Sequence, residues 1–168
     1  MRKIVSVSVV AIFIFASCLK KESTCNYSDS TVVAPVAEQE ALADSLAAHG
    51  ITASLHPAGF YYKINSQGSG SSVANLCTTL SVEYKGGFFN GKVFDSTLAN
   101  QPVNLELGGV IAGWQKGVPL VNSDGDITLY IPPSLAYGPS PVVNQSTGET
   151  IIPGNSYLVF NIHVVDIQ

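Results

Sequence analysis

Apolar and polar side chains alternate along most of the chain from residue 58 onward, and glycine, proline, asparagine and serine interrupt the alternation at short intervals. A period of two is the pattern of a β-strand with one buried face. The last alternating segment places Leu158, Phe160, Ile162 and Val164 on one face and leaves His163 on the other. We therefore predict a final strand with this apolar row in the core and His163 at the surface.

Three earlier segments show the same alternation and predict three more inward-facing rows. These rows are Phe60, Tyr62 and Ile64, then Leu80, Val82 and Tyr84, and then Ile127, Leu129 and Ile131. Several amphipathic strands joined by turns favour one curved antiparallel sheet. Between two strand segments, Asn90-Gly91 predicts a tight hairpin turn in which both residues adopt positive φ.

Two segments depart from the alternation and favour helices. The first, from Val110 to Val118, has small residues and one aromatic residue at spacings that fit a short helix covering the concave side of the sheet. The second runs from about Pro35 to His49, with a proline suited to the first helical turn and a glycine suited to the stop. The chain is therefore predicted to be an α+β protein.

The first residues have the composition of an export signal. Arg2 and Lys3 precede an uncharged run that ends at Phe15 and is too short to span a bilayer. Cys18 then follows two small residues, an order similar to a bacterial lipobox, in which the cysteine becomes the lipid-modified first residue of the mature chain. The alternative is an ordinary signal cleaved near Ser17, with Cys18 as a plain thiol.

These features divide the chain into four parts. Residues 1–17 are expected to be a lipoprotein signal peptide and residues 58–168 the globular domain. Residues 18–34 are polar and small, without helical or strand periodicity, so we expect a flexible tether. Residues 35–57 would form the N-terminal helix and a linker.

Two cysteines remain besides Cys18, in a chain that is expected to enter an oxidising compartment. Cys25 and Cys77 form an even pair, so a disulfide between them is predicted, and two unpaired buried thiols are the alternative. The bond would tie the tether to the domain. No metal site is expected, because the three histidines share no ligand spacing with the cysteines or with one another.

Charge and composition exclude two classes of function. The net charge is −4 at pH 7, and Arg2 is the only arginine. An acidic chain of this kind has little electrostatic attraction for nucleic acid, so we expect no nucleic-acid partner. The chain also contains no Gly-x-Ser-x-Gly elbow, which argues against a serine hydrolase.

Four separate motifs carry the functional signal. They are Asn90-Gly91-Lys92-Val93-Phe94-Asp95, Val110-Ile111-Ala112-Gly113-Trp114, Ala136-Tyr137-Gly138 and Ile151-Ile152-Pro153. In this order and spacing the chain resembles the FKBP-type peptidyl-prolyl cis-trans isomerases, from about Tyr62 to Asp166. The resemblance implies an α+β domain in which a curved antiparallel β-sheet wraps around a short helix. This chain would add an N-terminal helix.

The resemblance also implies roles for individual residues. Asp95 would lie beside the twisted amide, the Tyr137 hydroxyl would donate to a substrate carbonyl, and four residues are expected to be catalytic: Asp95, Tyr137, Phe94 and Tyr84. The substrate-binding set places Trp114 beneath the prolyl ring and the Ile111 N–H towards a second carbonyl. That set comprises Trp114, Val110, Ile111, Ile152, Phe160 and Val103.

The chain departs from the family pattern at three places. Val103 stands where another aromatic wall is usual, which predicts a wider pocket on that side. The arginine that often accompanies the acidic residue is absent, so Asp95 needs another partner such as the Tyr84 hydroxyl. The stretch from Pro139 to Thr150 is longer than the family's core pattern needs, and we expect it to form an extended flap.

The resulting expectation is a prolyl isomerase that needs no cofactor, acts as a monomer and is anchored by lipid to a membrane of the bacterial cell envelope. Its partners would be proline-containing unfolded or exported polypeptides. A noncatalytic peptide-binding module or holdase chaperone with the same fold is the alternative. A structural surface lipoprotein with no cleft function is the third possibility.

Overall fold

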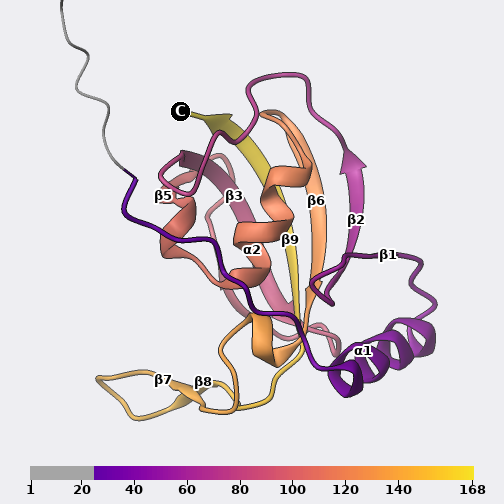
Figure 1. The fold of residues 1–168 in the computed structure, drawn as a ribbon. Coiled ribbons are helices and arrows are strands. Elements are labelled where there is room, and N and C mark those ends of the chain that lie inside the picture. Colours follow the sequence, from indigo (N-terminus) through magenta and orange to yellow (C-terminus); the bar gives the residue numbers. More distant parts are fainter. Residues whose placement is uncertain (1–24) are drawn as a thin grey trace, which may run out of the picture.

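A computed structural model of the chain describes residues 25–168 (Figure 1). The expected signal peptide and the expected lipidation site, Cys18, lie outside the described residues. Among the residues that are described, no helix is both long enough and apolar enough to cross a membrane.

One antiparallel sheet of seven strands forms the body of the protein. Its strands are β1 (Ser54–Leu55), β2 (Tyr61–Ser66), β3 (Thr79–Phe88), β4 (Val93–Ser96), β5 (Val103–Glu106), β6 (Gly125–Ile131) and β9 (Leu158–Ile167). The spatial order is β1-β2-β6-β9-β3-β4, with β5 also paired to β3. The strands β7 (Val142–Val143) and β8 (Thr150–Ile152) form a separate hairpin. The predicted α+β class with one main antiparallel sheet is confirmed.

The short helix α2 (Ala112–Gly117) lies across the concave side of the sheet, close to β6 (Figure 1). Two of its glycines explain this close approach. A Cβ atom at Gly113 would lie 2.7 Å from the Ile131 side chain, and one at Gly117 would lie 2.6 Å from Leu129. Real Cβ atoms do not approach other atoms so closely, so larger residues would push the helix away from the strand.

Burial follows the predicted alternation in most strands. The row on β6 is fully buried, and the row on β9 is at most 3 % exposed. Burial of each such side chain contributes about 1.5–3 kcal/mol. Ile64 is the exception, because 38 % of it is exposed. Ile64 is still in register opposite the buried Ile127, and the pairing of β2 with β6 shifts only after it, so Ile64 shares the inward face. It lies beyond Tyr61 and Tyr62, the two residues of β2 that pair with β1, and is therefore at an open edge of the sheet.

The turn between β3 and β4 also differs from the prediction. Only Gly91 has positive φ, at +84°, whereas Asn90 does not. The Gly91 N–H donates to the Phe88 carbonyl at 2.9 Å, and the Phe88 N–H donates to the Lys92 carbonyl at 3.0 Å. These bonds are those of a three-residue loop that ends in a left-handed glycine, which requires one positive φ rather than two.

The helix α1 (Val36–Ala48) matches the predicted N-terminal helix and docks on the other face of the sheet. Leu42 and Leu46 are buried with Tyr130, whose side chain points away from α2. After the helix, the Ile51 N–H donates to the Leu46 carbonyl at 2.9 Å. The two helices therefore cover opposite faces of one sheet.

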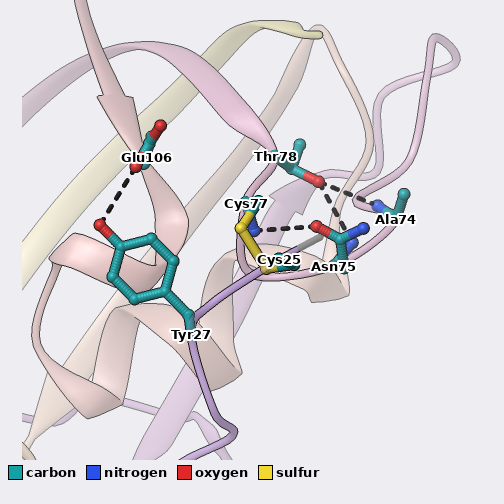
Figure 2. Close-up of a disulfide and its surroundings, with 7 residues drawn as sticks. All are labelled: Cys25, Tyr27, Ala74, Asn75, Cys77, Thr78 and Glu106. Carbon is teal, nitrogen blue, oxygen red and sulfur yellow. Dashed lines mark hydrogen bonds between the residues drawn. A yellow bond between two sulfur atoms is a disulfide. The ribbon is translucent and has the colours of Figure 1, made fainter. Parts of the chain in front are cut away.

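Residues 25–34, which we call the strap, contact the domain, although their composition led us to expect a flexible tether up to residue 34. The predicted disulfide between Cys25 and Cys77 is present (Figure 2). The Tyr27 hydroxyl donates to Glu106 at 3.1 Å, and the buried Ala34 donates its N–H to the Ala58 carbonyl at 2.9 Å. Composition indicated only a polar segment, whereas the contacts that hold it come from parts of the chain far away in sequence.

Candidate active site

A cavity of about 260 Å³ opens beside α2 and is lined by residues from most parts of the domain. The lining residues are Tyr84, Phe94, Asp95, Val103, Leu105, Gly109, Val110, Ile111, Trp114, Tyr137 and Phe160. They include every residue that the sequence placed in the pocket except Ile152. The structure therefore brings nine of the expected residues together, and their roles remain proposals.

Two further lining residues, Leu105 and Gly109, were not predicted. Leu105 belongs to β5 and Gly109 to the 3-10 helix η1 (Leu107–Gly109), which leads into the Val110-Ile111 rim. The position of Leu105 two residues after Val103 on the same strand would have indicated it, because alternate residues share a face. A glycine offers no comparable signal.

Ile152 lies outside the cavity lining. It is only 4 % exposed, belongs to the main core cluster, and pairs with Val142 in the β7–β8 hairpin. Figure 1 shows this hairpin extending away from the sheet. No residue between Pro139 and Ser156 lines the cavity, so the expected flap does not cover it in this structure.

Three aromatic rings around Trp114 form the floor and walls. The Trp114 ring is perpendicular to the rings of Tyr84 and Phe160, with centroids 5.3 Å apart in both cases. Phe94 meets Phe160 edge to face at 5.7 Å. This arrangement is favourable because the positive edge of one ring faces the negative face of the next. Trp114 is only 4 % exposed, so the surrounding side chains hold its ring in one position.

A glycine on β3 makes room for two of these rings. A Cβ atom at Gly86 would lie 2.7 Å from Phe160 and 2.9 Å from Phe94. The register also pairs Gly86 with both Phe160 on β9 and Asp95 on β4. The strand that carries Tyr84 therefore needs a glycine two residues later, so that both neighbouring aromatic rings can turn towards the cavity.

Asp95 is the only charged side chain in the lining. The Tyr84 hydroxyl donates to its Oδ2 atom at 2.5 Å, which is the partner expected in place of the missing arginine. Burial and this hydrogen bond to a carboxylate raise the pKa of Tyr84, so its hydroxyl stays protonated as a donor. A donated hydrogen bond of this kind fixes the direction of the carboxylate.

Tyr137 stands at the mouth of the cavity and is 44 % exposed. It follows the 3-10 helix η3 (Pro133–Leu135) and precedes Gly138, whose φ is +71°. Partial burial and the negative charge of Asp95 raise the pKa of Tyr137. No acceptor within residues 25–168 takes its hydroxyl proton, so the group is available to a bound molecule.

The rim at Ile111 presents a second donor. Its carbonyl accepts the N–H groups of Trp114 and Gln115, at 2.9 and 3.1 Å, as α2 begins. Its own N–H has no acceptor among the described residues. The Gln115 Nε2 group donates to the carbonyls of Gly108 and Val110, which holds the rim against the helix.

Val103 leaves one side of the cavity open. It lies on β5 opposite Val82 and is 41 % exposed. A valine covers less of a bound ring than an aromatic residue would, so this side is wider and more accessible to water. The cavity as a whole is an apolar, aromatic recess with one carboxylate, one hydroxyl donor and one backbone donor. In the described part of the chain, no group of three or more potential metal ligands gathers anywhere.

Comparison with known proteins shows the family of the chain. Residues 70–165 match the family described as FKBP-type peptidyl-prolyl cis-trans isomerase. A probable FKBP-type isomerase from Haemophilus influenzae is 41 % identical over 111 residues, which cover 66 % of this chain and 43 % of the relative. The isomerase FkpA of Escherichia coli K12 is 36 % identical over 111 residues, covering 66 % and 38 %. The chain thus spans about two fifths of the length of these curated relatives.

Solved structures show the same fold. The crystal structure of FkpA from Escherichia coli superimposes with a TM-score of 0.62 at 30 % identity, over 79 % of this chain and 63 % of that one. The crystal structure of AtFKBP13 gives a TM-score of 0.62 at 31 % identity, over 70 % of this chain and 99 % of that one. The second protein is therefore matched over nearly its whole length.

Proposed function

The chain belongs to the family of FKBP-type peptidyl-prolyl cis-trans isomerases, and we propose that it accelerates the rotation of peptide bonds that precede proline. One observation carries the proposal: an apolar, aromatic recess with a single carboxylate also presents two donors that have no acceptor among residues 25–168, the Ile111 N–H and the Tyr137 hydroxyl. Such a recess fits an apolar ring flanked by backbone carbonyls, which is the shape of a prolyl peptide.

The chemistry needs no nucleophile and no cofactor. Rotation of a prolyl bond meets a barrier of about 18–20 kcal/mol because amide resonance is lost. The planar amide is more polar than the twisted one, so an apolar pocket disfavours the planar ground state relative to the transition state. The aromatic walls and the single charge of this cavity provide that environment.

The proposal gives a role to the aromatic and polar residues of the lining. The prolyl ring lies on Trp114 between the aromatic walls, while the Ile111 N–H and the Tyr137 hydroxyl donate to carbonyls on either side of the prolyl bond. Asp95, oriented by Tyr84, lies beside the twisted amide. Donors fixed before the substrate arrives stabilise a transition state without reorganising, which makes them effective.

The substrates are proposed to be unfolded or exported polypeptides that contain proline, and the setting is proposed to be the bacterial cell envelope. The Cys25–Cys77 disulfide supports this setting, because such bonds persist in oxidising compartments and are rare in the cytosol. Lipidation of Cys18 would hold the protein on a membrane, and we propose that it acts as a monomer.

The anchor can be tested directly. Full-length protein made in a bacterium should partition with membranes, whereas Cys18→Ser should be soluble or remain unprocessed. Several acyl chains bind firmly, although a single chain binds only marginally. Mass spectrometry of the N-terminal peptide supplies the measurement, and a wholly soluble wild-type protein with a free Cys18 thiol would contradict the anchor.

The activity is tested with a short peptide that carries an apolar residue before proline. Wild-type protein should accelerate cis–trans exchange, and Tyr137→Phe and Asp95→Asn should each lower kcat/KM by about 10-fold or more, because each removes a polar contribution at nearly constant volume. Matched controls are Tyr61→Phe on β2 and Asp124→Asn in an exposed turn with φ of +61°, which asparagine tolerates. Both controls should retain full activity.

The same experiment separates isomerase from holdase. A wild-type protein that binds unfolded chains and suppresses their aggregation, but does not accelerate exchange, would support the noncatalytic module. Loss of activity in the controls as well would indicate general damage to the fold. Circular dichroism and thermal unfolding of every variant distinguish these outcomes.

A further inference from the structure

The strap and α1 reach two short turns that form one side of the cavity. Figure 1 shows the strap running across α2 before α1 begins at the end of the domain where η3 lies. We propose that this N-terminal part helps to shape the pocket. Tyr27 is a positioning residue for the Ile111 rim, and Glu38 is a positioning residue for Tyr137. The inference rests on the proposed function.

Tyr27 supports the turn that precedes the rim. Its ring lies directly against Gly108, where any Cβ atom would overlap the ring. Its hydroxyl donates to Glu106 at 3.1 Å on the other side of that turn (Figure 2). The next residue, Gly109, lines the cavity and leads into Val110. The ring therefore limits how far the rim can move away from the helix.

The strap that carries Tyr27 is fixed on both sides. Cys25, two residues earlier, is bonded to Cys77, and the Cys77 N–H donates to the Asn75 side chain at 2.8 Å (Figure 2). Farther along, the Lys116 ammonium donates to the Ser30 carbonyl. Lys116 belongs to α2, two residues after Trp114, so the strap also holds the helix that forms the cavity floor.

Glu38 supports the turn that presents Tyr137. Its Oε2 atom accepts the Ser134 N–H at 3.0 Å, across 96 residues of sequence. Ser134 lies within η3. The Gly138 N–H donates to the Pro133 carbonyl at 2.9 Å, which closes a turn that contains both Ser134 and Tyr137. Tyr137 therefore belongs to the turn that Glu38 contacts. A hydrogen bond to a carboxylate is stronger than one to a neutral acceptor. Glu38 is therefore placed to set the position of this turn.

Helix α1 can act in this way because it is itself fixed. Leu42 is fully buried and Leu46 is 4 % exposed, both against Tyr130 on β6. Glu38 lies one turn earlier on the same helix, at the edge of this contact. A shift of a donor by about 1 Å can lower a rate 100-fold, so contacts that hold Tyr137 affect catalysis without touching substrate.

The decisive test for Glu38 is a double-mutant cycle with Tyr137. Glu38→Ala should lower kcat/KM about 10-fold in the wild-type background and have no further effect in Tyr137→Phe, because the loss acts through the Tyr137 hydroxyl. Glu38→Gln keeps an acceptor of similar length and should restore most of the activity. Glu40→Ala, on the exposed face of the same helix, is the matched control and should change nothing.

An equal loss in both backgrounds, or no loss in Glu38→Ala, would overturn the proposal for Glu38. The positioning is also measured without turnover, because Glu38→Ala should shift the NMR resonances of the Tyr137 ring and amide while leaving those of Tyr84 unchanged. An inactive wild-type protein would reject the isomerase function alone, since these resonances still decide whether Glu38 positions Tyr137. Unchanged Tyr137 resonances would reject the positioning.

Tyr27 is tested by enlarging the glycine beneath it. Gly108→Ala should displace the strap, change the fluorescence of Trp114, the only tryptophan, and lower kcat/KM about 10-fold. In a Tyr27→Ala background the methyl group added by Gly108→Ala has space, so Gly108→Ala should change neither the Trp114 fluorescence nor kcat/KM any further. Equal effects of Gly108→Ala in both backgrounds would reject Tyr27 as a support of the rim.

Discussion

The two sides of the cavity are built in different ways. On the sheet side, Tyr84, Phe94, Asp95 and Phe160 project from β3, β4 and β9, which are held by continuous antiparallel pairing. On the turn side, the rim from Gly109 to Ile111 and Tyr137 are carried by short turns with few regular hydrogen bonds. Residues on the sheet side therefore contribute to both the stability of the fold and the pocket. The positions of the residues on the turn side, in contrast, can be changed by contacts from outside the sheet.

The largest expected effect is on the sheet side. Phe160→Ala removes a ring that is 3 % exposed and contacts both Trp114 and Phe94, so the free energy of unfolding should fall by about 3–5 kcal/mol. Activity should be lost with it. Urea unfolding followed by circular dichroism measures the change. If the free energy of unfolding fell by less than about 1 kcal/mol, the residues of the sheet side would not be part of the stabilising core, and the contrast with the turn side would be wrong.

The next effect concerns the disulfide that fixes the strap beside the turn side. Cys77→Ser should lower the free energy of unfolding by about 2–4 kcal/mol, because the bond closes a loop with a sequence separation of 52 and restricts the unfolded chain. Thermal unfolding with and without reductant supplies the measurement, and reductant should have no effect on the variant. Complete alkylation of both thiols in unreduced protein would contradict the bond.

The pH dependence compares one tyrosine from each side. The pKa values of Tyr84 and Tyr137 are both raised above the ordinary value of 10.0, chiefly by burial, so the fold favours the neutral phenols. Their contribution to stability is therefore complete below pH 10 and is lost as the pH rises above it. We expect kcat/KM to show no phenol titration between about pH 7 and 9.5. If kcat/KM of the wild-type protein declined in this pH range and that of Tyr137→Phe did not, the pKa of Tyr137 would be at or below the ordinary value, which would contradict the expectation.

The smallest expected effect is at the open part of the sheet side. Val103→Phe should fill space beside the cavity and lower KM by about 5-fold for peptides with an apolar residue before proline, because one aromatic contact contributes roughly 1 kcal/mol. The side chain is 41 % exposed, so a larger residue meets little resistance. Val93→Phe, on β4 outside the cavity and 40 % exposed, is the matched control. An unchanged KM would show that this side does not contact the peptide.

The same comparison explains what could be predicted from sequence. The rows on β6 and β9 follow from alternation, because burial on one face of a strand imposes a period of two. The sheet side was predictable for this reason, together with the family motifs. Ile64 shares the predicted face but remains 38 % exposed, because alternation assigns a residue to a face and does not show how far the neighbouring strand extends to cover it.

The supports of the turn side had no such signal. The bond from Glu38 to Ser134 joins a helix to a turn 96 residues away, and neither residue belongs to a motif. Tyr27 lies in a polar segment that composition assigned to a tether, although its ring packs on Gly108. Contacts of this kind depend on the completed fold, and only the three-dimensional arrangement reveals them.

The place of β9 in the sheet has a consequence for the order in which the molecule assembles. This strand comes last in the chain, yet it lies between β6 and β3 and pairs with both along its length. During synthesis from the N-terminus, β3 remains without its central neighbour until β9 emerges. Long-range pairing of this kind is slow. A protein proposed to assist folding thus leaves its own sheet edges uncovered until its final strand is delivered.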